Sequence, residues 1–146
     1  MTSASRPAPR GPSAALLHDL AQFRYRLRRF LRFSEQAARA AGITPLQHQL
    51  LLGVAGFTGR GWATISELTE CLQERHNAVV ALVNRAATAG LVRKRRADDD
   101  RRVVRVDLTP RGRRLLLALT RRHRQELAAF PRDLRWLGAV SAGGAS

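Results

Sequence analysis

The chain has 146 residues, of which 45% are hydrophobic, so it can form one domain with a core and is not disordered throughout. Its 26 basic and 11 acidic side chains give a formal net charge of +15, far above what solubility requires, which favours a polyanionic partner. Lys94 is the only lysine, and arginine offers a planar fork of donors that fits phosphates and guanine edges.

A basic arm at residues 1–12 precedes a long helix, predicted over residues 13–41 with Ser13 as its cap and Gly42 after its end. Its apolar positions alternate four and three residues apart, as in a coiled-coil seam, while arginines occupy the opposite face. Such a seam can pack within the chain or also form a subunit interface, and we favour the second. It consists of Leu16, Leu20, Phe23, Leu27, Phe30, Ser34, Ala37 and Ala41.

The middle of the chain predicts three further helices. Two of them begin with capping boxes, in which Thr44 pairs with Gln47 and Thr64 with Glu67. Residues 56–61 form the turn between these two helices. After a very short turn at residues 73–74, a longer helix covers residues 75–89 and ends at Gly90. Two helices joined by so short a turn indicate a helix-turn-helix.

Residues 91–108 predict a β-hairpin, the wing. Two basic runs flank the acidic turn at residues 97–100, and apolar residues alternate through Val104, Val106 and Leu108, as in a strand with one buried face. Thr109 caps a last long helix that reaches about residue 130 and pairs with the first. Pro131 breaks it, and residues 133–137 form a final turn before a small-residue tail at 141–146.

The sequence has no features of an exported or membrane-bound protein. Cys71 is the only cysteine, which excludes an intrachain disulfide. The first twelve residues lack the apolar stretch of a secretory signal, and no apolar run is long enough to span a membrane. We therefore expect a cytoplasmic protein with no membrane partner.

Several short stretches, in this order and with compatible spacing, resemble the MarR (multiple antibiotic resistance regulator) family of transcriptional regulators. They are Leu82-Val83-Asn84-Arg85, Ala89-Gly90-Leu91-Val92, Asp99-Asp100-Arg101-Arg102, and Leu108-Thr109 followed by Gly112. The resemblance covers about residues 44–119. It departs from the family pattern at Glu74-Arg75-His76-Asn77, which lacks the common Ser cap, and in a short C-terminal region.

The resemblance implies a mainly α fold with a small β-hairpin wing, that is, a winged helix-turn-helix with long terminal dimerisation helices. The MarR-like domain would cover residues 13–140, with the winged helix-turn-helix at about 44–109 and the dimerisation helices at about 13–41 and 110–137. It further implies a homodimer on a pseudo-palindromic DNA operator, acting as a repressor that a small ligand or oxidation relieves.

The helix at residues 75–89 is the predicted recognition helix, because its inward face is taken by Val79, Val83 and Ala86. Asn bonds an adenine edge in two places and Arg a guanine edge. A merely solvated polar face is the alternative interpretation. The predicted DNA-binding residues of this helix are Arg75, His76, Asn77, Ala81, Asn84 and Arg85.

In the wing, Arg101 or Arg102 is the predicted minor-groove probe, since arginine is attracted to the negative potential of a narrow groove. Asp98 or Asp100 can hold that arginine by a salt bridge, and a charged surface turn without DNA contact is the alternative. The predicted DNA-binding residues of the wing are Arg95, Arg96, Asp100, Arg101 and Arg102.

Further residues bear on dimerisation, redox chemistry, metal binding and catalysis. Cys71 is interpreted as a small buried filler rather than a redox switch, and His18, His48 and His123 as structural rather than metal-binding. The chain shows no catalytic constellation, cofactor motif or metal-binding cluster, so we expect no enzyme, no cofactor and no metal. The predicted dimerisation residues are Leu16, Leu20, Phe23, Leu27, Leu116, Leu127 and Phe130.

The sequence therefore predicts a DNA-binding transcriptional regulator whose partners are a double-stranded operator and a second copy of itself, with a small-molecule effector left open. The alternative is a nonspecific basic architectural or RNA-associated protein. Such a protein needs charge but no base-reading helix, so binding to specific and scrambled DNA at several salt concentrations separates the two.

Overall fold

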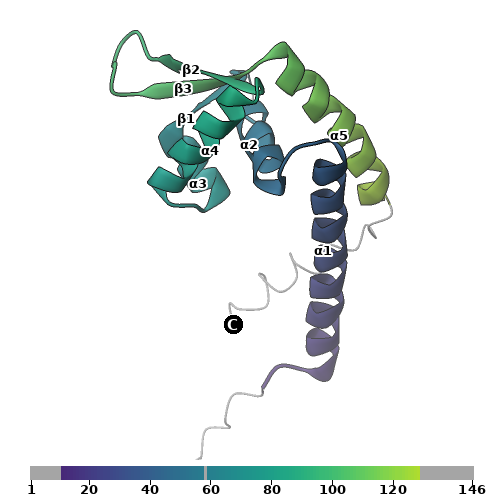
Figure 1. Ribbon diagram of the computed structural model, residues 1–146. Helices are drawn as coiled ribbons and strands as arrows, with labels where there is room; N and C mark the ends of the chain where they lie inside the picture. The colour runs from purple at the N-terminus through teal and green to yellow at the C-terminus, as the bar shows by residue number, and fades with distance from the viewer. Residues whose placement is uncertain (1–10, 58, 129–146) are drawn as a thin grey trace, which may run out of the picture.

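The computed structural model describes residues 11–57 and 59–128, which form five helices and a three-stranded sheet (Figure 1). The predicted mainly α fold with a β-hairpin wing is confirmed. Most of the basic arm, the predicted interface residue Phe130, the break at Pro131, the turn at 133–137 and the tail lie outside the described residues.

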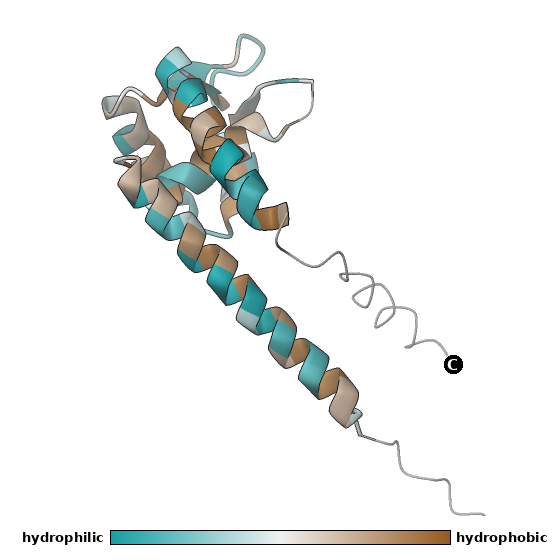
Figure 2. Ribbon diagram, turned by 90° about the vertical axis from the view of Figure 1, so that its right-hand side faces the viewer, coloured by the Kyte–Doolittle hydropathy of each residue, from teal (hydrophilic) through white to brown (hydrophobic). Residues whose placement is uncertain are grey.

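Helix α1 spans Ala14–Ala40, as predicted, and the Ser13 hydroxyl accepts a hydrogen bond of 3.2 Å from the Leu16 backbone N–H. Beyond its end Gly42 has φ +82°, a left-handed conformation that glycine adopts without strain. The N-terminal part of α1 extends away from the rest of the described chain (Figure 1), and Figure 2 shows hydrophobic and hydrophilic residues alternating along it.

Helices α2 (Pro45–Ala55) and α3 (Ile65–Leu72) both begin with the predicted capping boxes. The connection between them contains a strand, β1 (Trp62–Thr64), where the sequence predicted only a turn and a helix cap. Three residues are too few to show an alternating pattern, and β1 forms because it pairs with a distant strand, with Ala63 opposite Val106.

The helix-turn-helix consists of α3, a three-residue turn at 73–75 and α4 (His76–Thr88). Gln73 has φ 53° and closes α3 in the left-handed conformation. The residues predicted to face inward from α4 are all buried. They are Val79, Leu82, Val83 and Ala86.

The wing is formed by β2 (Val92–Arg96) and β3 (Val104–Leu108), antiparallel strands in a sheet of order β1-β3-β2. Val92 pairs with Leu108 and Arg95 with Arg105, which places the acidic turn at the tip of the hairpin. The hairpin is anchored to the body at one end, where Val92 of β2 and Leu108 of β3 are buried.

Helix α5 (Pro110–Ala128) begins where the wing ends, and Gly112 explains how closely the two meet. A Cβ atom on Gly112 would lie 2.0 Å from the carbonyl oxygen of Leu91, so only glycine fits there. Thr109 secures the same junction, because its hydroxyl donates a 2.6 Å hydrogen bond to the Gly90 carbonyl. The predicted pairing of α5 with α1 is confirmed, and the two helices lie side by side in Figure 1.

His48 of α2 and His123 of α5 meet inside the chain with ring centroids 4.8 Å apart. His123 Nδ1 lies 2.7 Å from the Leu119 carbonyl oxygen and its Nε2 lies 2.8 Å from Ser34 Oγ. A carbonyl oxygen can only accept, so Nδ1 carries the proton. Burial and the nearby His123 lower the pKa of His48 to about 4, which keeps His48 neutral at physiological pH.

Candidate nucleic-acid interface

Helix α4 exposes the face that the sequence assigned to DNA. Arg75 is the residue just before the first turn of α4. Its side chain makes no capping hydrogen bond within the described chain, and Arg75 is exposed. The free backbone N–H groups of such a helix start can bind phosphate. Ala81 is half-buried, and the other predicted residues, His76, Asn77, Asn84 and Arg85, are exposed.

Asn84 is tied to the wing by a contact that the sequence analysis missed. Lys94 of β2 donates a hydrogen bond from Nζ to Asn84 Oδ1. The bond leaves the amide nitrogen of Asn84 as the group free to donate outwards. In the sequence Lys94 stands out only as the single lysine, and the signal that identifies this contact is its outward register on the strand next to α4.

The predicted wing residues have two kinds of environment. Arg95 is paired with Asp107 across the hairpin, at 2.7 Å, and so lies on the body of the wing. Towards the tip, Arg96 Nη1 donates a 2.8 Å hydrogen bond to the backbone oxygen of Arg101, which fixes the turn.

Arg102 is the wing residue that Asp100 holds in place. Its Nε lies 3.2 Å from Asp100 Oδ1, which also accepts a 3.0 Å hydrogen bond from the Arg102 backbone N–H. These hydrogen bonds lower the pKa of Asp100. The Arg102 side chain is nonetheless 92% exposed. The pairing therefore orients the guanidinium without burying it, as the sequence analysis predicted for one of the two acids.

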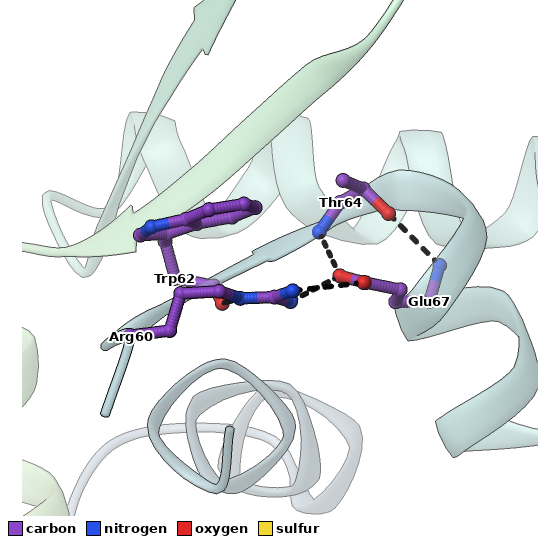
Figure 3. A network of polar contacts seen from close by, with 4 residues as sticks. All are labelled: Arg60, Trp62, Thr64 and Glu67. Carbon is purple, nitrogen blue, oxygen red and sulfur yellow. Dashed lines mark hydrogen bonds and ion pairs between the residues drawn. The ribbon is translucent and has the colours of Figure 1, made fainter. Parts of the chain in front are cut away.

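A second polar network, absent from the sequence predictions, fixes the start of α3 (Figure 3). Arg60 binds Glu67 with both terminal nitrogens and donates a 3.0 Å hydrogen bond to the Trp62 carbonyl oxygen. Its guanidinium carbon lies 3.9 Å from the Trp62 ring centroid and 4.4 Å from that of Phe57. The hydrogen bonds from Arg60 are the main reason that the pKa of Glu67 is lowered. We call Arg60, Trp62 and Glu67 the Arg60 clamp.

The Arg60 clamp also connects to the wing. Two arginines lie over the Trp62 ring. Arg60 is one, and Arg105 of β3 is the other, with its guanidinium carbon 4.1 Å from the ring centroid. Trp62 thus links α3, through Arg60 and Glu67, to the central strand of the sheet. Because α3 in turn packs against α4, this network connects α4 to the wing.

Two concave sites border the helix-turn-helix. One, of about 370 Å³, lies between the starts of α3 and α4 and the outer end of the wing, and its lining includes Ser66, His76 and Arg102. The other, of about 410 Å³, is mainly apolar and lies between α2 and α3. Its lining residues are Gln49, Leu52, Gly53, Gly56, Phe57, Cys71 and Leu72.

The interpretation of Cys71 as a buried filler is wrong. The thiol-bearing residue is exposed and lines the larger cavity. Cys71 lies near the end of α3, where the helix surface is no longer covered, and the inward positions of α3 are taken by Ile65 and Leu68. The prediction rested on the general tendency of free cysteine to be buried and took no account of its position at the end of α3.

The predicted dimerisation residues divide into exposed and buried groups. Leu20, Leu27 and Leu127 are 39%, 38% and 50% exposed, and Leu16 and Phe23 are half-buried. Leu116 differs, because it is only 5% exposed and packs in the core of its own chain. Little of its surface is available to a second subunit, so Leu116 is a core residue of the α1–α5 pairing.

The three histidines considered for a metal site do not come together. His48 and His123 pack against each other, whereas His18 is exposed on the part of α1 that extends from the body. Within residues 11–57 and 59–128, no group of three or more His, Cys, Asp or Glu side chains is placed to hold a metal ion. Among these residues there is also no helix both long and apolar enough to cross a membrane.

Comparison with known proteins shows which family and which solved structures this chain resembles. Residues 41–103, from the end of α1 to the start of β3, match the model of the MarR family. No curated protein sequence matches the chain. Solved structures do match, at low sequence identity.

AbsC, a MarR family transcriptional regulator from Streptomyces coelicolor, is 18% identical, with a TM-score of 0.72 over 90% of this chain and 93% of AbsC. A mutant of MarR from E. coli in complex with operator DNA is 19% identical, with a TM-score of 0.67 over 86% of this chain and 92% of the other. BpsR from Bordetella bronchiseptica, whose DNA binding is regulated by 6-hydroxynicotinic acid, is 18% identical, with a TM-score of 0.61 over 86% and 95%. Residues 41–103 are therefore similar to the MarR family model, and the described chain has the winged helix-turn-helix fold of these solved structures.

Proposed function

We propose that the protein is a sequence-specific transcriptional regulator that binds double-stranded operator DNA as a homodimer. The observation that carries this proposal is the exposed polar face of α4, with His76, Asn77 and Asn84, beside a wing whose tip presents Arg102. A helix of this kind enters the major groove while the wing arginine reaches the adjacent minor groove.

The proposal of a homodimer rests on α1 and α5. Leu20 and Leu27 are large apolar side chains left partly exposed on the seam of α1, and Leu127 is partly exposed at the end of α5. Two-fold symmetry would then place two copies of α4 about one helical turn of DNA apart, roughly 10 bp between half-site centres. Leu27→Asp should convert the dimer to monomers or aggregates, because burying an unpaired charge costs several kcal/mol, roughly. A wild-type protein that is monomeric at micromolar concentration in sedimentation would contradict this part.

We further propose that the regulator is a repressor released by a small molecule, and that it acts in the cytoplasm. The mainly apolar cavity of about 410 Å³ between α2 and α3 has the size of a small-molecule site and lies against the helix that supports α4. MarR from E. coli was solved with operator DNA, and DNA binding by BpsR is regulated by 6-hydroxynicotinic acid.

The test is operator selection from a random duplex library, with wild type and with Asn77→Ala. Removing a base-reading side chain should cost about 1–3 kcal/mol on the selected operator and much less on scrambled DNA. Arg75→Ala, which removes a side chain beside the helix start, should instead weaken binding to both duplexes equally. It should also lower by about one the slope of log affinity against log salt concentration. If Asn77→Ala, Asn84→Ala and His76→Ala all keep the wild-type preference, α4 does not read sequence. A wild type that binds all duplexes equally would favour the nonspecific architectural alternative.

A further inference from the structure

Most of the positive charge of this protein lies outside the winged helix-turn-helix. Residues 41–109 carry ten basic and seven acidic side chains, which leaves a net charge of +3. Helix α5 alone carries six arginines and one glutamate, for a net charge of +5 in 19 residues. DNA binding by α4 and the wing therefore does not account for the charge of α5.

The arginines of α5 all lie on its exposed side. Its buried side is formed by Gly112, Leu116, Leu119 and His123, which pack towards the body. Arg111 is fixed to the end of α4, because its Nη1 donates a 2.6 Å hydrogen bond to the Ala89 carbonyl oxygen. The other five have no ion-pair or hydrogen-bond partner among the described residues, and we call them the α5 basic face: Arg113, Arg114, Arg121, Arg122 and Arg124.

The α5 basic face is arranged in rows. Arg114 and Arg121 are seven residues apart, about two helical turns, and Arg113 and Arg124 are eleven apart, about three turns, so each pair lies along one line of the helix. Leu117, 49% exposed, lies between the two rows. Arg121 and Arg124 are three residues apart and are therefore neighbours on the helix surface, where like charges destabilise a helix. An anion that follows the helix axis would remove that repulsion.

This face is separate from the operator-binding surface. Figure 1 shows the wing leaving the body on one side and α5 on the other. In Figure 2, which looks from the α5 side, α5 lies towards the viewer and carries hydrophilic residues along much of its length. A two-fold interface built on this face would bring the same arginines of two copies together, so a second copy of the chain is not its partner.

We propose that the α5 basic face binds the phosphate backbone of a second DNA duplex, so that the protein bridges two DNA segments. Arginine matches phosphate with two parallel donors, and a duplex presents one negative charge per about 1.7 Å of its axis. The proposal rests on the proposed function, because an operator held by α4 keeps further DNA close to α5.

The composition of α5 argues against two other polyanions. The helix contains no Phe, Tyr or Trp, whereas proteins that bind single-stranded nucleic acid stack bases on aromatic side chains. A helix that lies on a membrane needs a wide, free apolar face, but Leu116 and Leu119 of α5 are buried against the body and the exposed Leu117 is flanked by arginines. Both remain as arms of the test.

The experiment holds the full-length protein on an immobilised operator duplex and measures capture of a labelled 30-bp duplex of unrelated sequence. A fourfold variant of the α5 basic face, Arg113→Gln, Arg114→Gln, Arg121→Gln and Arg124→Gln, should lower capture at least tenfold while operator affinity stays within a factor of about three. The matched control removes four exposed arginines of α1, Arg24→Gln, Arg26→Gln, Arg28→Gln and Arg32→Gln, and should keep capture. The log–log salt slope of capture should fall by about 0.9 for each phosphate that the variant no longer neutralises.

The proposal is overturned if wild type on its operator captures no second duplex, or if the α1 control loses capture as the α5 variant does. Stronger capture of a single-stranded oligonucleotide, or of vesicles containing anionic lipid with no capture of duplex, also overturns it. If no operator sequence is found, the proposed function fails on its own. The same variants are then compared in binding the unrelated duplex free in solution, where an α5 variant that binds like the α1 control overturns the bridge.

Discussion

Lys94 of the wing donates a hydrogen bond to the amide oxygen of Asn84 on α4. An Asn that reads adenine in two places needs its oxygen to accept from adenine N6 and its nitrogen to donate to N7. With one lone pair of this oxygen bound to Lys94, the amide nitrogen is the fully free group of Asn84, and a donor suits the acceptors purine N7, guanine O6 or thymine O4. Under the proposed function, the wing strand thereby takes part in what α4 can read.

The first prediction is that Lys94→Met changes sequence preference without removing DNA binding. Freeing the Asn84 oxygen should shift the preferred base at its position towards adenine. A double-mutant cycle with Asn84→Ala on the selected operator should give a coupling energy of about 0.5–3 kcal/mol. Arg93→Met, which removes a charge from the same strand, serves as the control. Additive effects of Lys94→Met and Asn84→Ala would mean that the bond has no role in recognition.

The second prediction concerns the junction between the wing and α5. Gly112→Ala places a methyl group 2.0 Å from a backbone oxygen, that of Leu91, and a backbone cannot give way cheaply. We expect a loss of at least about 3 kcal/mol in the free energy of unfolding, at or above the upper end of overpacking costs. In Gly42→Ala, the new methyl group meets nothing within 4 Å and only the φ of +82° is unfavourable, so about 1 kcal/mol should be lost. Urea unfolding measures both, and equal losses would contradict the close approach.

The third prediction is that the Arg60 clamp requires arginine rather than any cation. Arg60→Lys keeps the charge but loses the two-point binding of Glu67 and the stacking on Trp62 and Phe57. We expect Arg60→Lys to lose about 1–2 kcal/mol of unfolding free energy and Arg60→Ala somewhat more. Arg39→Ala, at an exposed pair with Glu35, should change stability by less than about 0.5 kcal/mol. A full rescue by lysine would show that only charge matters.

Sequence patterns predicted those parts of the molecule whose signals are local. Capping residues at Thr44 and Thr64 and the glycines at 42 and 90 marked helix ends, because each satisfies a backbone requirement at its own position. Strand β1 could not be predicted, because its pairing partner lies more than 35 residues away in sequence. The Arg60 clamp could not be predicted, because it depends on the geometry of stacking on the Trp62 ring. The exposure of Cys71 depends on where neighbouring helices end. The sequence of a single helix carries no information on that.

The fourth prediction is a loss of stability in mild acid that depends on His48. An unfolded histidine takes up a proton near pH 6.5, but the folded pKa of His48 is about 4. Between these values the unfolded state binds more protons, so the unfolding free energy falls as pH falls, by about 1 kcal/mol per pH unit near pH 5.5. Well above pH 6.5, from about pH 7.5, both states are neutral at this residue and the effect vanishes.

The measurement for His48 is urea unfolding of wild type and His48→Gln from pH 7.5 to pH 5. The variant should show a flatter pH dependence, whatever its stability at pH 7.5. His18→Gln, at an exposed position, should keep the wild-type slope. Parallel curves for wild type and His48→Gln would contradict the lowered pKa.

The fifth prediction is that Arg102 of the wing probes the minor groove and that Asp100 positions it. Arg102→Ala should weaken operator binding with little change in stability, because its side chain is 92% exposed. The loss should be larger for operators with A·T-rich flanks, whose narrow minor groove attracts arginine.

Asp100→Asn should raise nonspecific affinity by removing a negative charge near DNA, yet reduce the preference for A·T-rich flanks, since Arg102 then loses its ion pair. Binding to operators with A·T-rich and G·C-rich flanks at one salt concentration separates the two effects, with Asp98→Asn as the control that removes a charge from the same turn. If Arg102→Ala leaves flank preference intact, the wing does not enter the groove in the way proposed.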